Sequence, residues 1–234
     1  MTEQHLVIDA RFCGPPDSGN GGYVCGVLAE TLGGTAEVTL RRPAPIGRPL
    51  NVRRGPGGAV ELFDGDEIVA EGVPAPRPEA NLPEPVTAEE VQQAAGRYPG
   101  FFQHPFATCF VCGPERAEGD GLRIFPGPVS GRNLVAATWR PDWTVTGADG
   151  LVRPEFLWTA LDCSGAFASG FPATLMVLGR LTAELVGPVR PGPEYLVLGW
   201  SEGSEGRKHF AGTALLDGSG GLLALARATW ISLR

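Results

Sequence analysis

The sequence contains one arrangement of elements twice, and this repeat constrains the fold more than any other feature of the chain. Each copy has a helical stretch, a strand-like segment, a corner rich in proline and a Leu-x-Asp-Gly turn. In the first copy these lie at 19–30, 37–40, 43–49 and 62–65, and in the second at 153–162, 179–185, 187–193 and 215–218. Two units of about a hundred residues are too few for a solenoid. The repeat therefore predicts a fused dimer of similar halves that share one core.

Composition favours a globular protein and excludes some classes of partner. The 234 residues are 43% hydrophobic and 19% charged, which is enough apolar material for an ordinary core. The net charge of -7 argues against nucleic acid or an anionic membrane as the main partner. No apolar run approaches the roughly 18 residues that a membrane span needs, and the first residues lack the pattern of a leader peptide. We expect a cytoplasmic protein whose five cysteines, an odd count, remain reduced.

Helix and strand signals divide the chain into three parts. Apolar spacing predicts one helix at about 21–32 and another at about 153–169, each followed by antiparallel strands, which is an α+β layout. In the second half, strands are expected at 121–126, 133–140, 175–186, 194–201, 207–216 and 222–233. Between the halves, a proline-rich linker precedes a capping box, Thr87-Ala88-Glu89-Glu90, that opens a short helix. We predict a first unit at 1–74, the linker with its helix at 75–106 and a second unit at 107–234.

The helix openings resemble those of the hotdog-fold thioesterases, and the whole pattern resembles acyl-CoA thioesterase relatives with two fused hotdog units. Single-unit members carry His-Gly-Gly at the helix start and an Asp or Glu eight residues after the first of those glycines. The first half has Asn20-Gly21-Gly22, with Ala29 at the carboxylate spacing. The second half has Arg153-Pro154-Glu155, yet Asp162 lies eight residues after Pro154. The resemblance implies a tandem (double) hotdog, two antiparallel sheets each wrapped around a central helix.

The two halves are expected to share one composite site. Eight residues of helix span roughly 12 Å, too far for a carboxylate to serve the start of its own helix. If the two helices pack antiparallel, Asp162 instead faces Asn20-Gly21-Gly22, where unpaired N–H groups favour a developing negative charge. Asp162 then acts as general base or as nucleophile, with Asn20 and Gly22 completing the catalytic set.

Four further residues are predicted to contact the substrate: Gly21, Tyr23, Thr159 and Ser164. Structural alternatives exist for the glycines, for Asp162, and for Thr159 and Ser164. The two glycines could form a tight strand-to-helix turn, Asp162 could be a salt-bridged structural residue, and Thr159 and Ser164 could bond the helix backbone. The mirror-image site, Glu30 facing Arg153-Pro154-Glu155, has a proline without an N–H and a competing acid, so we interpret it as decayed and Glu30 as a solvated surface residue.

Cys109-Phe110-Val111-Cys112-Gly113 has the form of half a metal site. A tetrahedral site needs two more ligands, and the remaining candidates are His5, Cys13, Cys25, His104, Cys163 and His209. Because a second Cys-x-x-Cys is absent, we predict reduced thiols and no metal; structural zinc and a redox or partner-chain pair are the alternatives. Five arginines could meet coenzyme A phosphates, but we favour solvent-facing positions on alternate strand residues: Arg41, Arg42, Arg48, Arg53 and Arg54.

These observations together predict a cytoplasmic thioesterase that hydrolyses an acyl thioester of coenzyme A or of a carrier, with no cofactor. Two alternatives stay open: a non-catalytic acyl or CoA-ester binding protein, since fold does not fix function, and an enoyl-CoA hydratase or dehydratase. The latter is disfavoured because the histidines lie outside the helix motifs. Fused units still expose sheet edges, so we also predict a homodimer.

Overall fold

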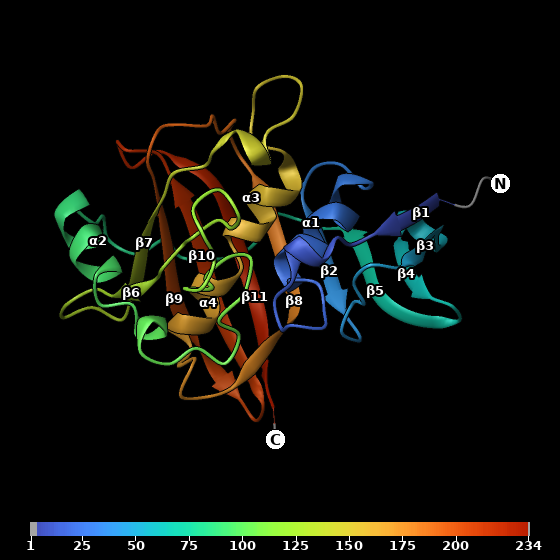
Figure 1. Ribbon diagram of the computed structural model, residues 1–234, viewed down its shortest axis with the longest axis horizontal. Coiled ribbons are helices and arrows are strands. Elements are labelled where there is room, and N and C mark those ends of the chain that lie inside the picture. The colour runs from blue at the N-terminus through green and yellow to red at the C-terminus, as the bar shows by residue number, and fades with distance from the viewer. Residues whose placement is uncertain (1–3, 234) are drawn as a thin grey trace.

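The computed structural model describes residues 4–233 and contains one antiparallel sheet of eleven strands (Figure 1). The strands are β1 (Gln4–Val7), β2 (Ala36–Leu40), β3 (Pro49–Arg54), β4 (Val60–Asp64), β5 (Glu67–Pro74), β6 (Gly127–Pro128), β7 (Val135–Trp139), β8 (Met176–Leu185), β9 (Tyr195–Glu205), β10 (Lys208–Leu216) and β11 (Leu222–Ser232). The α-helices are α1 (Gly21–Glu30), α2 (Ala88–Ala95), α3 (Pro154–Ala160) and α4 (Cys163–Ala168). Short 3-10 turns lie at Ala10–Phe12, Pro56–Gly58, Pro99–Phe101 and Trp143–Val145. Within residues 4–233, no helix has both the length and the apolar character needed to cross a membrane.

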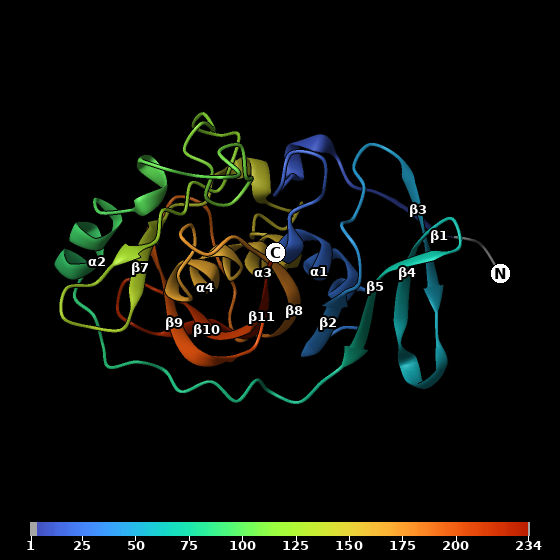
Figure 2. The same ribbon diagram turned by 90° about the horizontal axis from the view of Figure 1, so that it is seen from below.

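The two predicted sheets are joined into one. The strand order is β1-β3-β4-β5-β2-β8-β11-β10-β9-β7-β6, so the first half supplies one end and the second half the other. The join is the antiparallel pair β2–β8, in which Val38 lies opposite Leu181. Pairing these edges satisfies backbone groups that each half would otherwise expose. The sheet curves around α1, α3 and α4, and its inner face forms the main core with them (Figure 2).

The predicted antiparallel contact between the two central helices is confirmed. A Cβ on Gly22 would lie 3.0 Å from the Trp158 carbonyl oxygen, and a Cβ on Gly26 would lie 2.7 Å from Glu155 Cα. Residue numbers therefore increase along α1 where they decrease along α3, which means that the two helices run antiparallel. Glycine is needed at both places because the backbones approach so closely.

The predicted single helix at 153–169 is wrong in one respect: it is broken at Asp162 into α3 and α4. Asp162 has φ -78° and ψ -82°, outside the helical region, and precedes α4 as its N-cap. Two interactions replace continuous helix bonding here. The Leu161 carbonyl accepts a hydrogen bond from Thr213 Oγ1 at 2.8 Å, and the Asp162 side chain bonds to α1.

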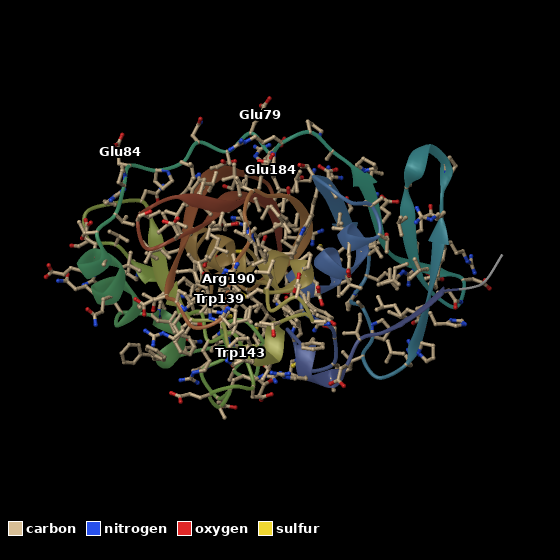
Figure 3. All side chains as sticks on the ribbon, turned by 90° about the horizontal axis from the view of Figure 1, so that it is seen from above. Glu79, Glu84, Trp139, Trp143, Glu184 and Arg190 are labelled. Atoms are coloured by element: carbon tan, nitrogen blue, oxygen red, sulfur yellow. The ribbon has the colours of Figure 1, made fainter. Side chains whose placement is uncertain are left out.

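The predicted helix after the linker is confirmed, including its capping box: Thr87 and Glu90 each bond the other's backbone N–H. Residues 75–87 contain neither helix nor strand and run along the outer side of the sheet to α2 (Figure 2). Figure 3 shows Glu79 and Glu84 pointing outward from this segment, while Arg77 pairs with Glu184 of β8 at 3.3 Å.

Helix α2 covers part of the outer sheet face, which the sequence did not indicate. Val91 and Ala94 pack in a second apolar cluster with the outward residues of β9, Leu196, Leu198 and Trp200. Alternate residues of β9 face the main core. Both faces of the sheet are therefore apolar at this end, and the chain buries the outer one with its own linker helix.

Residues 99–126 lie on the side of the helices away from the sheet (Figure 2). A strand was predicted at 121–126, but these residues are irregular. Their backbone bonds within the loop instead, since Leu122 N–H donates to the Phe110 carbonyl at 2.8 Å and Ile124 N–H to the Val111 carbonyl at 2.9 Å. This loop lies over the helices and carries Cys109 and Cys112.

Candidate functional site

Asp162 links the two halves of the chain. Its Oδ2 accepts hydrogen bonds from Asn20 Nδ2 at 2.8 Å and from Gly22 N–H at 3.1 Å. Asn20 is also the N-cap of α1, because its Oδ1 accepts from Tyr23 N–H at 3.0 Å. Asn20 therefore fixes the start of α1 and the position of the carboxylate together. The sequence predicted Asn20 as a site residue but not as the cap.

The environment of Asp162 disfavours its charged form. The side chain is 2% exposed, and burial raises the pKa of its carboxyl to about 7, against the opposing effect of the Gly22 N–H bond. Oδ1 is buried and has no hydrogen-bond partner among residues 4–233. One oxygen of this buried carboxylate is thus held by two donors and the other by none, which is not the arrangement of a structural ion pair.

The start of α1 offers one backbone donor beside this carboxylate. The N–H groups of Gly22 and Tyr23 are used by Asp162 and Asn20. Gly21 N–H, in the described part of the chain, has no acceptor. Gly21 also lines the cavity described next, and a Cβ there would lie 2.9 Å from Leu178 Cβ, so a larger residue would not fit.

A cavity of about 290 Å³ lies between the start of α1, the loop 104–112 and the inner face of β8 and β11. Asn20, Gly21 and Asp162 all line it. Most of the remaining wall is apolar and includes Phe106, Phe167, Phe171, Met176, Leu178 and Trp230. An apolar cavity with a few convergent polar groups is the usual form of a small-molecule site.

Three predicted substrate contacts lie elsewhere. Tyr23 stacks on Phe12, with ring centroids 4.3 Å apart. Thr159 Oγ1 donates to the Glu155 carbonyl at 2.6 Å, the helix-backbone bond considered as the alternative. Ser164 is fully buried where α4 meets Gly199 of β9. None of the three lines the cavity of the described chain.

The mirror-image position differs from the first site. Glu155 is buried and pairs with Arg153 at 3.1 Å, and burial raises the pKa of its carboxyl. Glu30 is exposed at the end of α1. The first site combines backbone N–H groups, the Asn20 amide and the Asp162 carboxylate. The mirror-image position instead holds Glu155, which is paired with Arg153 at the start of its own helix.

Glu30→Gln is accordingly expected to leave any hydrolytic activity within about two-fold of the unchanged protein, because an exposed acid contributes little to stability or to a distant site. Thiol release by the purified variant checks this. A large loss of activity would assign the chemistry to the mirror-image position instead.

The structure also brings four residues to the cavity that were not assigned to the site: His104, Cys109, Cys112 and Cys163. All five cysteines of the chain are free thiols. Hydrogen bonds from Cys112 and Cys163 hold the pKa of the Cys109 thiol well below its usual value. Burial raises the pKa of Cys112, and the hydrogen bond to Cys109 raises the pKa of Cys163. His104 is engaged at both ring nitrogens, by Phe106 N–H and by Cys112 Sγ. It was missed because the loop has no periodicity that predicts its path.

The arginine cluster is largely paired. Arg41, Arg42 and Arg48 form ion pairs with Glu71, Glu67 and Asp64. Arg53 lies over the Phe63 ring at 4.3 Å. Arg41 and Arg42 also line the cavity, and since both side chains are about half exposed, they mark its solvent end.

Comparison with known proteins identifies the fold. A scan against protein-family models found no match, and a search of curated proteins found none. Among solved structures, the chain is similar to a conserved protein with hot dog fold from Alicyclobacillus acidocaldarius (TM-score 0.64, 11% identity, 99% of this chain and 93% of that one). It is similar to a candidate thioesterase II from Thermobifida fusca (TM-score 0.64, 17% identity, 100% and 93%). It also resembles the tesB protein of Mycobacterium avium subs paratuberculosis (TM-score 0.58, 15% identity, 92% and 88%).

These alignments extend over nearly the whole of each chain. The chain therefore has the hotdog fold, as the helix openings predicted. At such low identity the similarity describes the fold, and the chemistry has to be argued from the site.

Proposed function

We propose that this protein hydrolyses an acyl thioester of coenzyme A or of a related carrier at a single composite site. One observation carries the proposal. Asp162 of the second half lines an apolar cavity and is held through Oδ2 by Asn20 and Gly22 of the first half, while its buried Oδ1 has no partner in the described chain. The structural similarity to a protein named as a thioesterase II agrees with it.

In the proposed reaction, Asp162 Oδ1 takes a proton from water as the water oxygen attacks the thioester carbonyl carbon. The carbonyl oxygen becomes negative and accepts a hydrogen bond from Gly21 N–H, at the positive end of α1. The carbon–sulfur bond then breaks, the proton returns from Asp162 to the leaving sulfur, and the products are a carboxylic acid and a thiol. Direct attack by Asp162 as a nucleophile is the variant of this mechanism that starts from the same geometry.

The size of the cavity and the charge at its solvent end indicate where the acyl group and the carrier of the substrate would bind. A volume of about 290 Å³ is just below the range of ligand sites, roughly 300 to 1,000 Å³. It suits the acyl group, whose carbon chain would contact Phe106, Phe171 and Met176. The carrier would then extend past Arg41 and Arg42, whose guanidinium groups can bind phosphate.

The test is thiol release from a panel of acyl-CoA esters that differ in chain length and branching. We expect turnover of some members, with the preferred acyl group limited by the apolar cavity. Binding of acyl-CoA without thiol release, measured by calorimetry, would instead make this a binding protein. Hydration of an enoyl-CoA would support the hydratase alternative, which the structure disfavours because both nitrogens of His104 are already engaged.

We also propose that the chain forms a homodimer. Within the described residues the sheet is open and ends at β1 and β6, and the backbone groups of an open edge can pair with a second copy. Light scattering is expected to give a mass of about twice the 24.6 kDa of one chain. A single monomeric species at micromolar concentration contradicts this.

A further inference from the structure

Three cysteines from two distant parts of the chain converge beside Asp162. Cys109 and Cys112 belong to the loop over the helices, and Cys163 is the first residue of α4. Their sulfur atoms all lie within 4.8 Å of one another, and all three side chains are buried. The Sγ atoms of Cys109 and Cys163 are 3.8 Å apart. The sequence argued against a metal because it offers only one Cys-x-x-Cys pair. The fold brings Cys163 to this pair as a third potential ligand.

The loop is built to hold its two sulfurs in place. Gly113 N–H donates to the Cys109 carbonyl at 2.9 Å, which closes a tight turn. A Cβ at Gly113 would lie 2.5 Å from the Ala107 carbonyl oxygen, so the turn requires glycine. The Tyr98 hydroxyl donates to the Cys112 carbonyl at 2.7 Å. A Cys-x-x-Cys turn closed by glycine is the form in which proteins present two thiolates to one metal ion.

His104 adds a hydrogen bond to the same group. Its Nε2 lies 3.3 Å from Cys112 Sγ, and its Nδ1 accepts from Phe106 N–H at 3.0 Å. Because Nδ1 is an acceptor, the neutral ring carries its proton on Nε2 and donates it to the sulfur. His104 therefore supports the charge of Cys112 as an outer partner rather than as a ligand.

The separation of Cys109 and Cys163 suits a metal and not a disulfide, and the separations from Cys112 are within 4.8 Å. With zinc–sulfur bonds of about 2.3 Å in tetrahedral geometry, the sulfurs of one site are about 3.8 Å apart. The Cys109–Cys163 distance has this value. A disulfide needs its sulfurs about 2.0 Å apart, which would require movement of the loop or of α4.

We propose that Cys109, Cys112 and Cys163 bind a Zn²⁺ ion as thiolates, with the fourth position of the metal open toward the cavity. All three cysteines line that cavity together with Asp162, so water or another small ligand can complete the tetrahedron. Binding releases the thiol protons to solvent and changes no oxidation state. Because Cys163 directly follows Asp162, the metal would tie the loop to the segment that positions the carboxylate.

Metal analysis of the protein, purified without a polyhistidine tag and without chelators, tests the site independently of any catalytic activity. We expect about one equivalent of zinc per chain, or uptake of about one equivalent after reduction and reconstitution. Cys109→Ser, Cys112→Ser and Cys163→Ser should each abolish stoichiometric binding. Cys25→Ser is the matched control, since Cys25 is buried in α1 outside the group and its loss should leave the zinc content unchanged. His104→Ala should weaken affinity by about 10- to 100-fold, as is typical when an outer partner is removed.

Cobalt titration of the reduced, metal-free protein covers the case in which a variant fails to fold. Intense absorption from sulfur-to-cobalt charge transfer, saturating near one equivalent, supports the three-thiolate site without any substitution. Absence of zinc and of this absorption in the reduced, folded protein overturns the proposal. So does a Cys109–Cys163 disulfide, found by mass spectrometry in protein purified under reducing conditions.

Discussion

Asp162→Asn is expected to lower thioester hydrolysis by at least about 10²-fold, the effect typical of losing a general base. The substitution changes little else. An amide oxygen can still accept from Asn20 Nδ2 and Gly22 N–H, which now hold Oδ2 at 2.8 and 3.1 Å, while the amide nitrogen takes the place of the unpartnered Oδ1. Because the lost group acts on the reacting atoms, the loss should fall on kcat more than on KM. Thiol release by the purified variant, measured with the best acyl-CoA of the panel, gives the result.

Two comparisons give this experiment its control. Near-ultraviolet circular dichroism and thermal unfolding show whether Asp162→Asn keeps the native packing. Glu30→Gln removes a carboxylate from the other end of α1, where it is exposed, and should keep its activity. Full activity in Asp162→Asn would remove the carboxylate from the mechanism and leave Asp162 with the structural role of joining the two halves.

The partnership of Asp162 with the first half could be predicted from the sequence because it follows from the regular geometry of helices. The spacing from Pro154 to Asp162 repeats that from Gly21 to Ala29, and antiparallel packing brings a residue at one helix's end to the start of the other. Gly22 and Gly26, four residues apart, could be recognised as a packing surface for the same reason. The contacts of Gly22 with Asp162 and of Gly26 with Glu155 realise that geometry.

Features that depend on irregular backbone could not be predicted in this way. The break at Asp162 arises from tertiary bonds to Thr213, Asn20 and Gly22, and nothing in the local sequence signals it. The loop that carries His104, Cys109 and Cys112 has no periodicity, so its path over the helices was not apparent. Cys163 was visible as a cysteine beside Asp162, but its proximity to Cys109 exists only in the folded chain. The same limitation applies to α2, whose sequence predicted a helix and not the sheet face that it covers.

The second large effect is expected at Gly22. A Cβ on this residue would lie 2.6 Å from Asp162 Cβ and 3.0 Å from the Trp158 carbonyl oxygen. Neither neighbour is the end of a flexible side chain, so α1 must move away from α3 and α4. Gly22→Ala should therefore destabilise the fold by about 1–3 kcal/mol, as overpacking of a close contact does. For a chain of this length that corresponds to a fall in Tm of roughly 2 to 12 °C, and Gly22→Val should cost more than Gly22→Ala.

Gly22→Ala should lower the rate of thioester hydrolysis by more than its loss of stability explains. Gly26→Ala is the variant that separates the effect on activity from the effect on packing. Moving α1 lengthens the bond from Gly22 N–H to Asp162, and a displacement of about 1 Å at a reacting group can cost roughly 10²-fold in rate. Gly26 lies one turn along the same helix. A Cβ added there would lie 2.7 Å from the Glu155 backbone, so Gly26→Ala has a comparable packing cost away from the carboxylate.

Gly96→Ala is the neutral control. Gly96 is the C-cap of α2, where the nearest atom to an added Cβ is 3.6 Å away, so this variant should change neither stability nor activity. Thermal unfolding and thiol release of the three variants would show equal losses of activity at Gly22 and Gly26 if α1 acts only as a packing element. A loss at Gly22 well beyond that at Gly26, at matched stability, is the result expected if its N–H group positions Asp162 for the reaction.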